Sequence, residues 1–181
     1  MMEFSNMILV AGEGRNVGKT SLACELIRHF SSAYELVGIK ISPHFHQKSH
    51  ENALVHHSDQ FIIYQEINAE SGKDSSRMLK AGAHKVYYIE SADKYIFDAL
   101  KVILPEIDSQ PVICESAALR KFVHPGIFLF MENIKATGNL KNNVQKEKAD
   151  LIVHASENSF NFNCRDIHFD GRRWTLLKTG R

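Results

Sequence analysis

The sequence predicts an α/β fold with a mostly parallel sheet, and three observations lead to this prediction. Short apolar runs alternate along the chain with segments whose apolar residues recur at helical spacing. A glycine-rich loop at residues 12–21 separates the first apolar run from the first amphipathic segment. Asp170-Gly171, between two alternating segments, predicts a C-terminal β-hairpin. A length of 181 residues suits one α/β core, so we expect a single domain over residues 1–181.

The N-terminal third is expected to run strand, helix, strand. Residues 7–11 form a short apolar run of the kind found in buried strands. A helix follows the glycine-rich loop, with its apolar positions at Leu22, Leu26, Ile27 and Phe30. Residues 35–42 predict the second strand, and the polar, histidine-rich residues 43–59 predict a loop. Residues 61–68 predict a short strand at the edge of an excursion from the sheet.

The middle of the chain repeats this alternation. Residues 74–83 predict a helix, and residues 85–90 predict a strand. A second helix is expected at residues 93–104, because Pro105 cannot donate the next helical hydrogen bond. Residues 111–115 then predict a buried strand that ends in a carboxylate.

The C-terminal third completes the predicted sheet. Residues 127–131 and 151–154 are apolar runs expected to be strands, with a polar helix at residues 139–149 between them. Residues 167–177 form the predicted hairpin. In a sheet of this kind ligands bind at the carboxyl ends of the strands, so the polar residues that directly follow strands become the candidate site.

Composition narrows the class of protein. Lys and Arg together number 22 against 21 for Asp and Glu, so no overall basic charge points to nucleic acid. We find no stretch of about 18 apolar residues for a membrane span, and the first residues lack a charged leader region, so we expect a cytoplasmic protein. The three cysteines are far apart in the sequence, which favours reduced, buried thiols over disulfides or a zinc site.

The glycine-rich loop has the composition of a phosphate-binding loop (Walker A), which predicts a three-layer P-loop NTPase fold. Its backbone N–H groups and the start of the following helix would hold phosphate oxygens. Lys19 would reach the β- and γ-phosphates, and the Thr20 hydroxyl would bind Mg²⁺. Glu13 stands where the usual motif has glycine, so we expect its carboxylate to face solvent or to pair with Arg15. The predicted nucleotide-binding residues in the loop are Gly12, Gly14, Arg15, Asn16, Val17, Gly18, Lys19, Thr20 and Ser21.

Two acidic residues are candidates for the metal side of such a site. Glu115 ends a buried strand, where it would hold Mg²⁺ or orient the attacking water, and Glu90 at the end of the preceding strand competes for that role. Asp74 either caps the helix that begins there or holds water on Mg²⁺. Arg77 would offer a bidentate contact to phosphate. We therefore predict Lys19, Asp74 and Glu115 as catalytic residues, and Thr20, Asp74 and Glu115 as metal ligands.

Two further patterns leave alternatives open. His44, His46 and His50 belong to a histidine-rich stretch that would bind Zn²⁺ or Ni²⁺, contact phosphate, or form a solvated loop. The base of the nucleotide is poorly encoded, because residues 131–135 contain Asn133 and Lys135 without the following Asp of guanine-specific proteins.

Several of these segments together resemble the family of the molybdopterin-guanine dinucleotide biosynthesis adapter protein MobB, over roughly residues 7–116. They are Val-Gly-Lys-Thr at residues 17–20, the strand that ends in Lys40 before a histidine-containing stretch, and Gly-Lys-Asp-Ser-Ser-Arg-Met-Leu-Lys-Ala-Gly-Ala at residues 72–83. Glu115 matches the family's acidic residue, whereas Ser116 stands where the family usually has glycine. The resemblance implies GTP binding with slow hydrolysis, a molybdopterin nucleotidyltransferase as partner, and a homodimer.

Two other functions remain as alternatives. The loop also resembles that of the dethiobiotin synthetase group, which implies an ATP-dependent kinase or ligase of a small molecule. Such an enzyme needs a basic or aromatic acceptor site, for which the sequence offers Lys40, Arg77 and Lys80. A metal-delivery NTPase would instead use the histidine-rich stretch. All three share Mg²⁺ and a nucleoside triphosphate, GTP or ATP.

Overall fold

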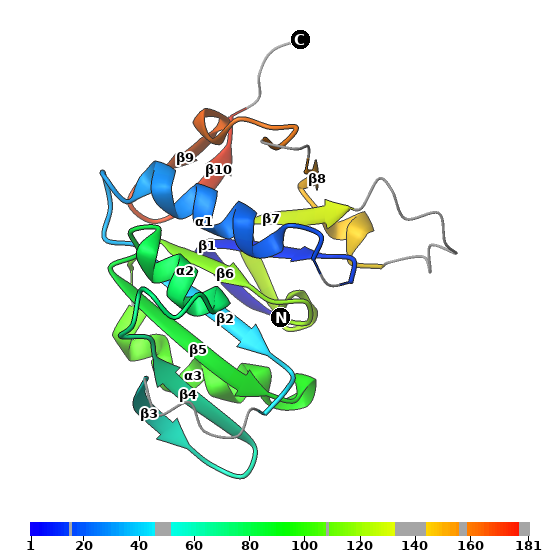
Figure 1. Cartoon of the computed structure of the whole chain (residues 1–181). Helices are drawn as coiled ribbons and strands as arrows, with labels where there is room; N and C mark the ends of the chain where they lie inside the picture. The colour runs from blue at the N-terminus through cyan, green and yellow to red at the C-terminus, as the bar shows by residue number, and fades with distance from the viewer. Residues whose placement is uncertain (15, 46–51, 108, 133–143, 156–158, 178–181) are drawn as a thin grey trace.

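The computed structural model describes residues 1–14, 16–45, 52–107, 109–132, 144–155 and 159–177, and an eight-stranded sheet forms its centre (Figure 1). The strand order is β3-β4-β5-β2-β6-β1-β7-β8. The six strands from β5 to β8 in this order are parallel, and β3 and β4 pair antiparallel at one side. The strands are β1 (Met2–Gly12), β2 (Val37–Ser42), β3 (Ala53–His57), β4 (Phe61–Gln65), β5 (Lys85–Ser91), β6 (Val112–Glu115), β7 (Val123–Glu132) and β8 (Leu151–His154).

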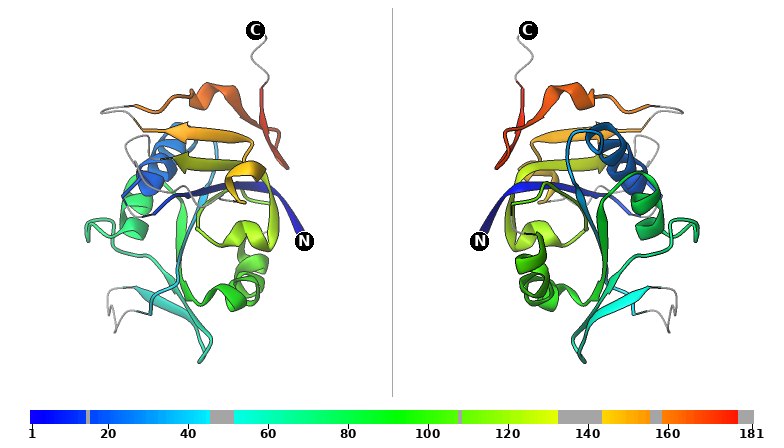
Figure 2. Two further views of the ribbon diagram at one scale, coloured as in Figure 1. Left: turned by 90° about the vertical axis from the view of Figure 1, so that its right-hand side faces the viewer. Right: turned by 90° about the vertical axis from the view of Figure 1, so that its left-hand side faces the viewer.

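Helices cover both faces of this sheet and give it three layers. Helices α1 (Lys19–Phe30) and α2 (Asp74–Lys80) lie on one face, and α3 (Ile96–Ile107) lies on the other (Figure 2). Each face has its own apolar core, because parallel strands bury both of their sides. The predicted α/β fold with a mostly parallel sheet is confirmed.

The alternation of side chains along β2 brings a polar side chain into the layer beneath α1 and α2. Val37, Ile39 and Ile41 belong to the core under α3. Successive side chains of a strand point to opposite faces, so Gly38, Lys40 and Ser42 face the other helices. Gly38 lets α2 approach the strand, since a Cβ there would lie 3.2 Å from Cε of Met78. Lys40, one step further along, therefore lies near the start of both helices.

The predicted C-terminal hairpin is confirmed as β9 (Ile167–Phe169) and β10 (Trp174–Leu176), which pair antiparallel and lie beside α1. Trp174 is fully buried, and its indole N–H donates to the carbonyl of Asn6 at 2.8 Å. Its ring contacts Phe30 of α1 edge-on, with centroids 4.8 Å apart. The hairpin thus closes the apolar core on the α1 side of the sheet.

Three predicted elements need correction. Pro105 lies inside α3 and does not end it. Proline gives up one hydrogen bond there and crowds the carbonyl of the preceding turn, and burial of Leu100, Ile103 and Ile107 against the sheet outweighs this cost. The predicted loop 43–59 contains β3, whose Leu54 and Val55 are exposed, so this edge strand lacks the alternation that would reveal it. β4 consequently lies between β3 and β5.

The third correction concerns the helix predicted at residues 139–149. Residues 139–143 lie outside the described residues, and the remainder forms a turn and a short 3₁₀ helix, η3 (Lys146–Lys148). Ala149 is already extended, because the chain enters β8 two residues later.

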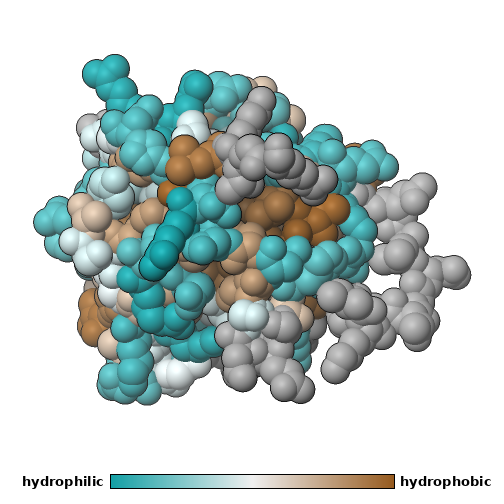
Figure 3. Space-filling model, turned by 90° about the horizontal axis from the view of Figure 1, so that it is seen from above, coloured by the Kyte–Doolittle hydropathy of each residue, from teal (hydrophilic) through white to brown (hydrophobic). Residues whose placement is uncertain are grey.

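The surface on the hairpin side is largely hydrophilic, with apolar areas between the polar side chains (Figure 3). Among the helices in the described ranges, none is both long and apolar enough to cross a bilayer.

The cysteines behave as predicted. Cys24, Cys114 and Cys164 are buried free thiols. Burial raises the pKa of each thiol, to about 11 for Cys164.

Candidate functional site

The glycine-rich loop joins the end of β1 to the start of α1. Gly14, Asn16 and Gly18 all have positive φ angles, of 64°, 60° and 98°, which is the left-handed region that glycine adopts without strain. Gly18 is the N-cap of α1, and the Leu22 N–H donates to its carbonyl at 2.9 Å. The first N–H groups of a helix have no partner within it, so the start of α1 offers donors to a bound anion.

Gly12 is required for a different reason, since β7 lies directly beside it. A Cβ at Gly12 would lie 2.5 Å from the carbonyl oxygen of Met131, closer than real contacts allow. The Glu13 N–H donates to that same carbonyl at 3.1 Å, and the Glu13 side chain is half-buried. Gly12 thus holds the start of the loop against β7. Val17, near the end of the loop, packs on the core beside α1. Arg15, with which Glu13 was expected to pair, lies outside the described residues.

Lys19, the first residue of α1, folds back over the loop, and its ammonium donates to the carbonyl of Gly14. Burial lowers the pKa of Lys19, while the nearby Glu115 carboxylate opposes that effect. This carbonyl is a weak partner for an ammonium, so a phosphate oxygen would displace it readily.

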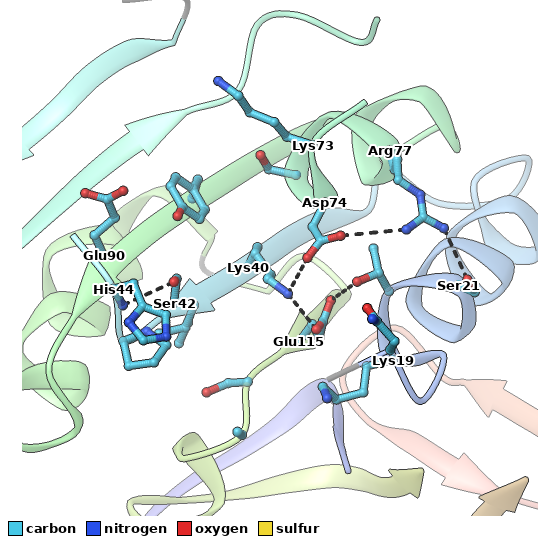
Figure 4. Close-up of a pocket in the computed structure, with 18 of the residues that line it drawn as sticks. Lys19, Ser21, Lys40, Ser42, His44, Lys73, Asp74, Arg77, Glu90 and Glu115 are labelled. Atoms are coloured by element: carbon cyan, nitrogen blue, oxygen red, sulfur yellow. Dashed lines mark hydrogen bonds and ion pairs between the residues drawn. The ribbon is translucent and has the colours of Figure 1, made fainter. Parts of the chain in front are cut away.

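Glu115 contacts the first turn of α1 through Thr20, the residue that follows Lys19. It ends β6, whose neighbour in the sheet is β1, and Glu115 is paired in register with Val10. The Thr20 hydroxyl donates to Oε2 of Glu115 at 2.7 Å, and the Glu115 side chain is only 3% exposed (Figure 4). The order of strands therefore produces the predicted proximity of the Thr20 hydroxyl and the strand-end carboxylate.

Lys40 approaches the same carboxylate from β2, the other neighbour of β6. Its ammonium lies 2.6 Å from Oε1 of Glu115 and 2.8 Å from Oδ2 of Asp74. Burial opposes the charge of Lys40, but the two carboxylates outweigh burial and raise its pKa. Burial likewise disfavours the charged form of Asp74, yet Lys40, Thr20 and Arg77 lower its pKa. Lys40 and Asp74 are thus held in their charged forms at neutral pH.

Asp74 is the first residue of α2 and does not serve as its N-cap. That position belongs to Lys73, and the Asp74 carboxylate points toward Lys40 and Arg77 instead (Figure 4). One nitrogen of the Arg77 guanidinium lies 3.7 Å from Oδ1 of Asp74, and another donates to Oγ of Ser21 at 3.1 Å. Arg77 therefore links α2 to the first turn of α1.

These residues line a cavity of about 760 Å³ at the carboxyl ends of the parallel strands. Its lining includes most of the predicted site residues: Gly14, Asn16, Gly18, Lys19, Thr20, Ser21, Asp74, Arg77 and Glu115. The cavity continues past Lys40 to Ser42, His44, Tyr88 and Glu90. Ser42, His44 and Glu90 lie on the opposite side of Lys40 from Lys19 and Ser21 (Figure 4). Glu90 is buried in that part of the cavity, and the carboxylate that accepts from Thr20 is that of Glu115.

Thr20, Asp74 and Glu115 present hard oxygen donors, which Mg²⁺ prefers. Mg²⁺ commonly takes one or two carboxylates, with phosphate oxygens and waters as its other ligands. Within the described residues, no group of three or more His, Cys, Asp or Glu side chains is arranged to hold a metal ion by itself. His46, His50, Asn133 and Lys135 lie outside those residues, whereas His44 is described and lines the cavity.

Sequence reasoning named Lys40 as the end of a strand and as a cation of a possible acceptor site, and did not place it between the two carboxylates. The sequence did contain a signal for this contact. Lys40 lies in a buried parallel strand, on the side that faces the helices, and a buried lysine requires a charged partner. Tyr88 was missed altogether. It neighbours Lys40 in register on β5, and burial raises its pKa. No protein-family model matches this chain, and no curated protein or solved structure matches it.

Proposed function

We propose that this chain is a P-loop protein that binds a nucleoside triphosphate, GTP in the first place, together with Mg²⁺. The observation that carries the proposal is the contact of 2.7 Å between the Thr20 hydroxyl and the Glu115 carboxylate, directly behind Lys19 at the start of α1. A hydroxyl at a helix start and a carboxylate on the adjacent parallel strand are the two protein groups that hold Mg²⁺ against the phosphates in P-loop NTPases.

Lys19, Asp74, Arg77 and Glu115 each have a role in this proposal. The loop N–H groups and Lys19 bind the β- and γ-phosphates, and Thr20, Asp74 and Glu115 hold Mg²⁺ directly or through water. When bound, Mg²⁺ offsets phosphate charge and polarises the phosphoryl oxygens. Arg77 supplies a planar donor to phosphate. Asp74 or Glu115 orients the attacking water, and an unassisted site of this kind hydrolyses slowly.

The resemblance to the MobB family supports the biological part of the proposal. We propose a slow GTPase or adapter for molybdenum cofactor maturation in the cytoplasm, acting as a homodimer with a molybdopterin nucleotidyltransferase. Residues 72–83 carry most of that resemblance, and Asp74 and Arg77 within them contact Lys40 and Ser21 at the cavity.

The size of the cavity supports a second candidate, an ATP-dependent kinase or ligase of a small molecule. The cavity continues over β2 and β5, beyond the groups proposed to hold Mg²⁺. His44, Lys73 and Tyr88 line that part, and they supply basic and aromatic groups suited to an acceptor. Nucleotide affinity and turnover separate the two candidates. The adapter predicts tighter binding of GTP than of ATP, with slow hydrolysis.

Thermal-shift titration with GTP, ATP, GDP and ADP in the presence of Mg²⁺ tests the shared core of both candidates. A ligand at about 100 times its dissociation constant adds about 2.7 kcal/mol to the free energy of unfolding. Lys19→Ala should lose the triphosphate shift while keeping the fold, and Lys101→Ala is the matched control, because Lys101 pairs with Asp98 on α3. The absence of any shift, or unchanged affinity in Lys19→Ala, would refute the phosphate-loop interpretation.

A further inference from the structure

Lys40 occupies the place between the two carboxylates that the proposed function assigns to Mg²⁺. Its side chain is 14% exposed, and its ammonium lies within 2.8 Å of an oxygen of Asp74 and of Glu115. We infer that Lys40 is the resident cation of this metal site: it holds the two carboxylates together without nucleotide, excludes free divalent cations, and yields to Mg²⁺ only when a triphosphate arrives with it. This inference rests on the proposed function, because that function assigns both carboxylates to Mg²⁺.

The exclusion of free cations follows from charge and space. The Lys40 ammonium fills the space between Oε1 of Glu115 and Oδ2 of Asp74, so Mg²⁺, which binds oxygen at about 2.0–2.1 Å, can bind both of these oxygens only if the lysine leaves. A released Lys40 would be a poorly hydrated cation next to a divalent one, with Lys19 also close by. Free Mg²⁺ therefore has to break the contacts of Lys40 without supplying a new partner for it.

A triphosphate removes this obstacle, because its terminal phosphate supplies the missing partner. Lysine is a flexible point charge whose ammonium can turn from one anion to another. Two lysines at the site are held on protein oxygens, Lys19 on the Gly14 carbonyl and Lys40 on the carboxylates. When the phosphates enter, Lys19 exchanges a neutral partner for an anionic one, and Lys40 exchanges its carboxylates for a phosphate. A diphosphate lacks the terminal phosphate, so Lys40 would discriminate against it.

Titration of the nucleotide-free protein with Mn²⁺, followed by the loss of the free Mn²⁺ electron paramagnetic resonance signal, tests the inference. Lys40→Met keeps the length of the side chain and removes its charge. We expect the wild type to show no saturable site up to millimolar Mn²⁺. Lys40→Met should gain one site, with a dissociation constant about tenfold or more below that concentration. The gained site should disappear in the double variant Lys40→Met/Glu115→Gln.

Lys101→Met, which removes an exposed lysine of α3, is the control for total charge and should not gain the site. Equal Mn²⁺ binding by the wild type and Lys40→Met would overturn the inference, as would a gain in Lys101→Met. Circular dichroism verifies the fold, and Lys40→Gln replaces Lys40→Met if the latter unfolds. Because nucleotide is absent, a gained Mn²⁺ site together with no thermal shift by any triphosphate would reject the proposed function alone.

Discussion

Removal of the Glu115 carboxylate should destabilise the nucleotide-free protein measurably. Glu115→Ala leaves the Lys40 ammonium with Asp74 as its remaining carboxylate and takes the acceptor from the Thr20 hydroxyl. Breaking a buried ion pair on one side costs about 3–5 kcal/mol. Asp74 still lies 2.8 Å from Lys40, but it is 43% exposed and compensates only in part. We therefore expect a loss of about 3 kcal/mol, a large share of the roughly 5–15 kcal/mol that stabilises a typical domain.

Glu115→Gln separates charge from hydrogen bonding. The amide oxygen still accepts from Thr20 or Lys40, so the expected loss is smaller, about 1–2 kcal/mol. Urea unfolding at neutral pH without Mg²⁺ measures both variants, and equal m-values would show that the unfolded state is unchanged. In a double-mutant cycle, Lys40→Met should cost less in the Glu115→Ala background than in the wild type. A loss below about 0.5 kcal/mol for Glu115→Ala, the range of ordinary surface substitutions, would refute this reasoning.

Three further predictions concern the loop, the hairpin and the thiols. Gly12→Ala, whose Cβ would press on the Met131 backbone, should cost about 1–3 kcal/mol, whereas Gly14→Ala, with no atom within 4 Å, should cost only about 1 kcal/mol for its positive φ; urea unfolding compares them. The Arg172 and Arg173 amides lower the pKa of Asp170 in the folded protein. The Asp170 carboxylate therefore stabilises the fold above its ordinary pKa of 3.8, and this stabilisation is lost as the pH falls through the lower pKa of the folded protein. The difference in stability between wild type and Asp170→Ala should shrink on acidification, and an unchanged difference would contradict this. Because burial raises their pKa, Cys24, Cys114 and Cys164 should react slowly with Ellman's reagent at neutral pH and promptly in urea, and fast reaction of all three in the native protein would show that they are accessible.

The fold was predictable where local pattern and tertiary environment agree. β8 has the predicted bounds, and the central parallel strands are apolar runs that both cores require. The predictions failed where the environment overrides the pattern. β3 is an edge strand with exposed Leu54 and Val55, so its sequence reads as a loop. Pro105 is tolerated in α3 because the helix buries Leu100, Ile103 and Ile107 against the sheet.

The site was predictable as a set of residues but not as a set of contacts. The loop motif and the strand-end carboxylate identify Lys19, Thr20 and Glu115 from local sequence alone. The position of Asp74 depends on β2 and β6 being neighbours, because Lys40 on β2 joins Asp74 to Glu115 on β6. Strand order is a property of the whole chain that no local pattern encodes. For this reason the choice between a cap and a site residue for Asp74 required the structure.

The charge of the cavity bears on which ligand it suits. Among its described lining residues, four cationic side chains (Lys19, Lys40, Lys73 and Arg77) face three carboxylates (Asp74, Glu90 and Glu115). A protein site for free Mg²⁺ needs oxygen ligands that offset the charge of the cation. The excess among these lining residues is one positive charge, which complements an anion that brings its own metal. Binding of free Mg²⁺ would therefore work against the charge of the cavity, whereas a Mg²⁺–triphosphate complex, with its net negative charge, suits it.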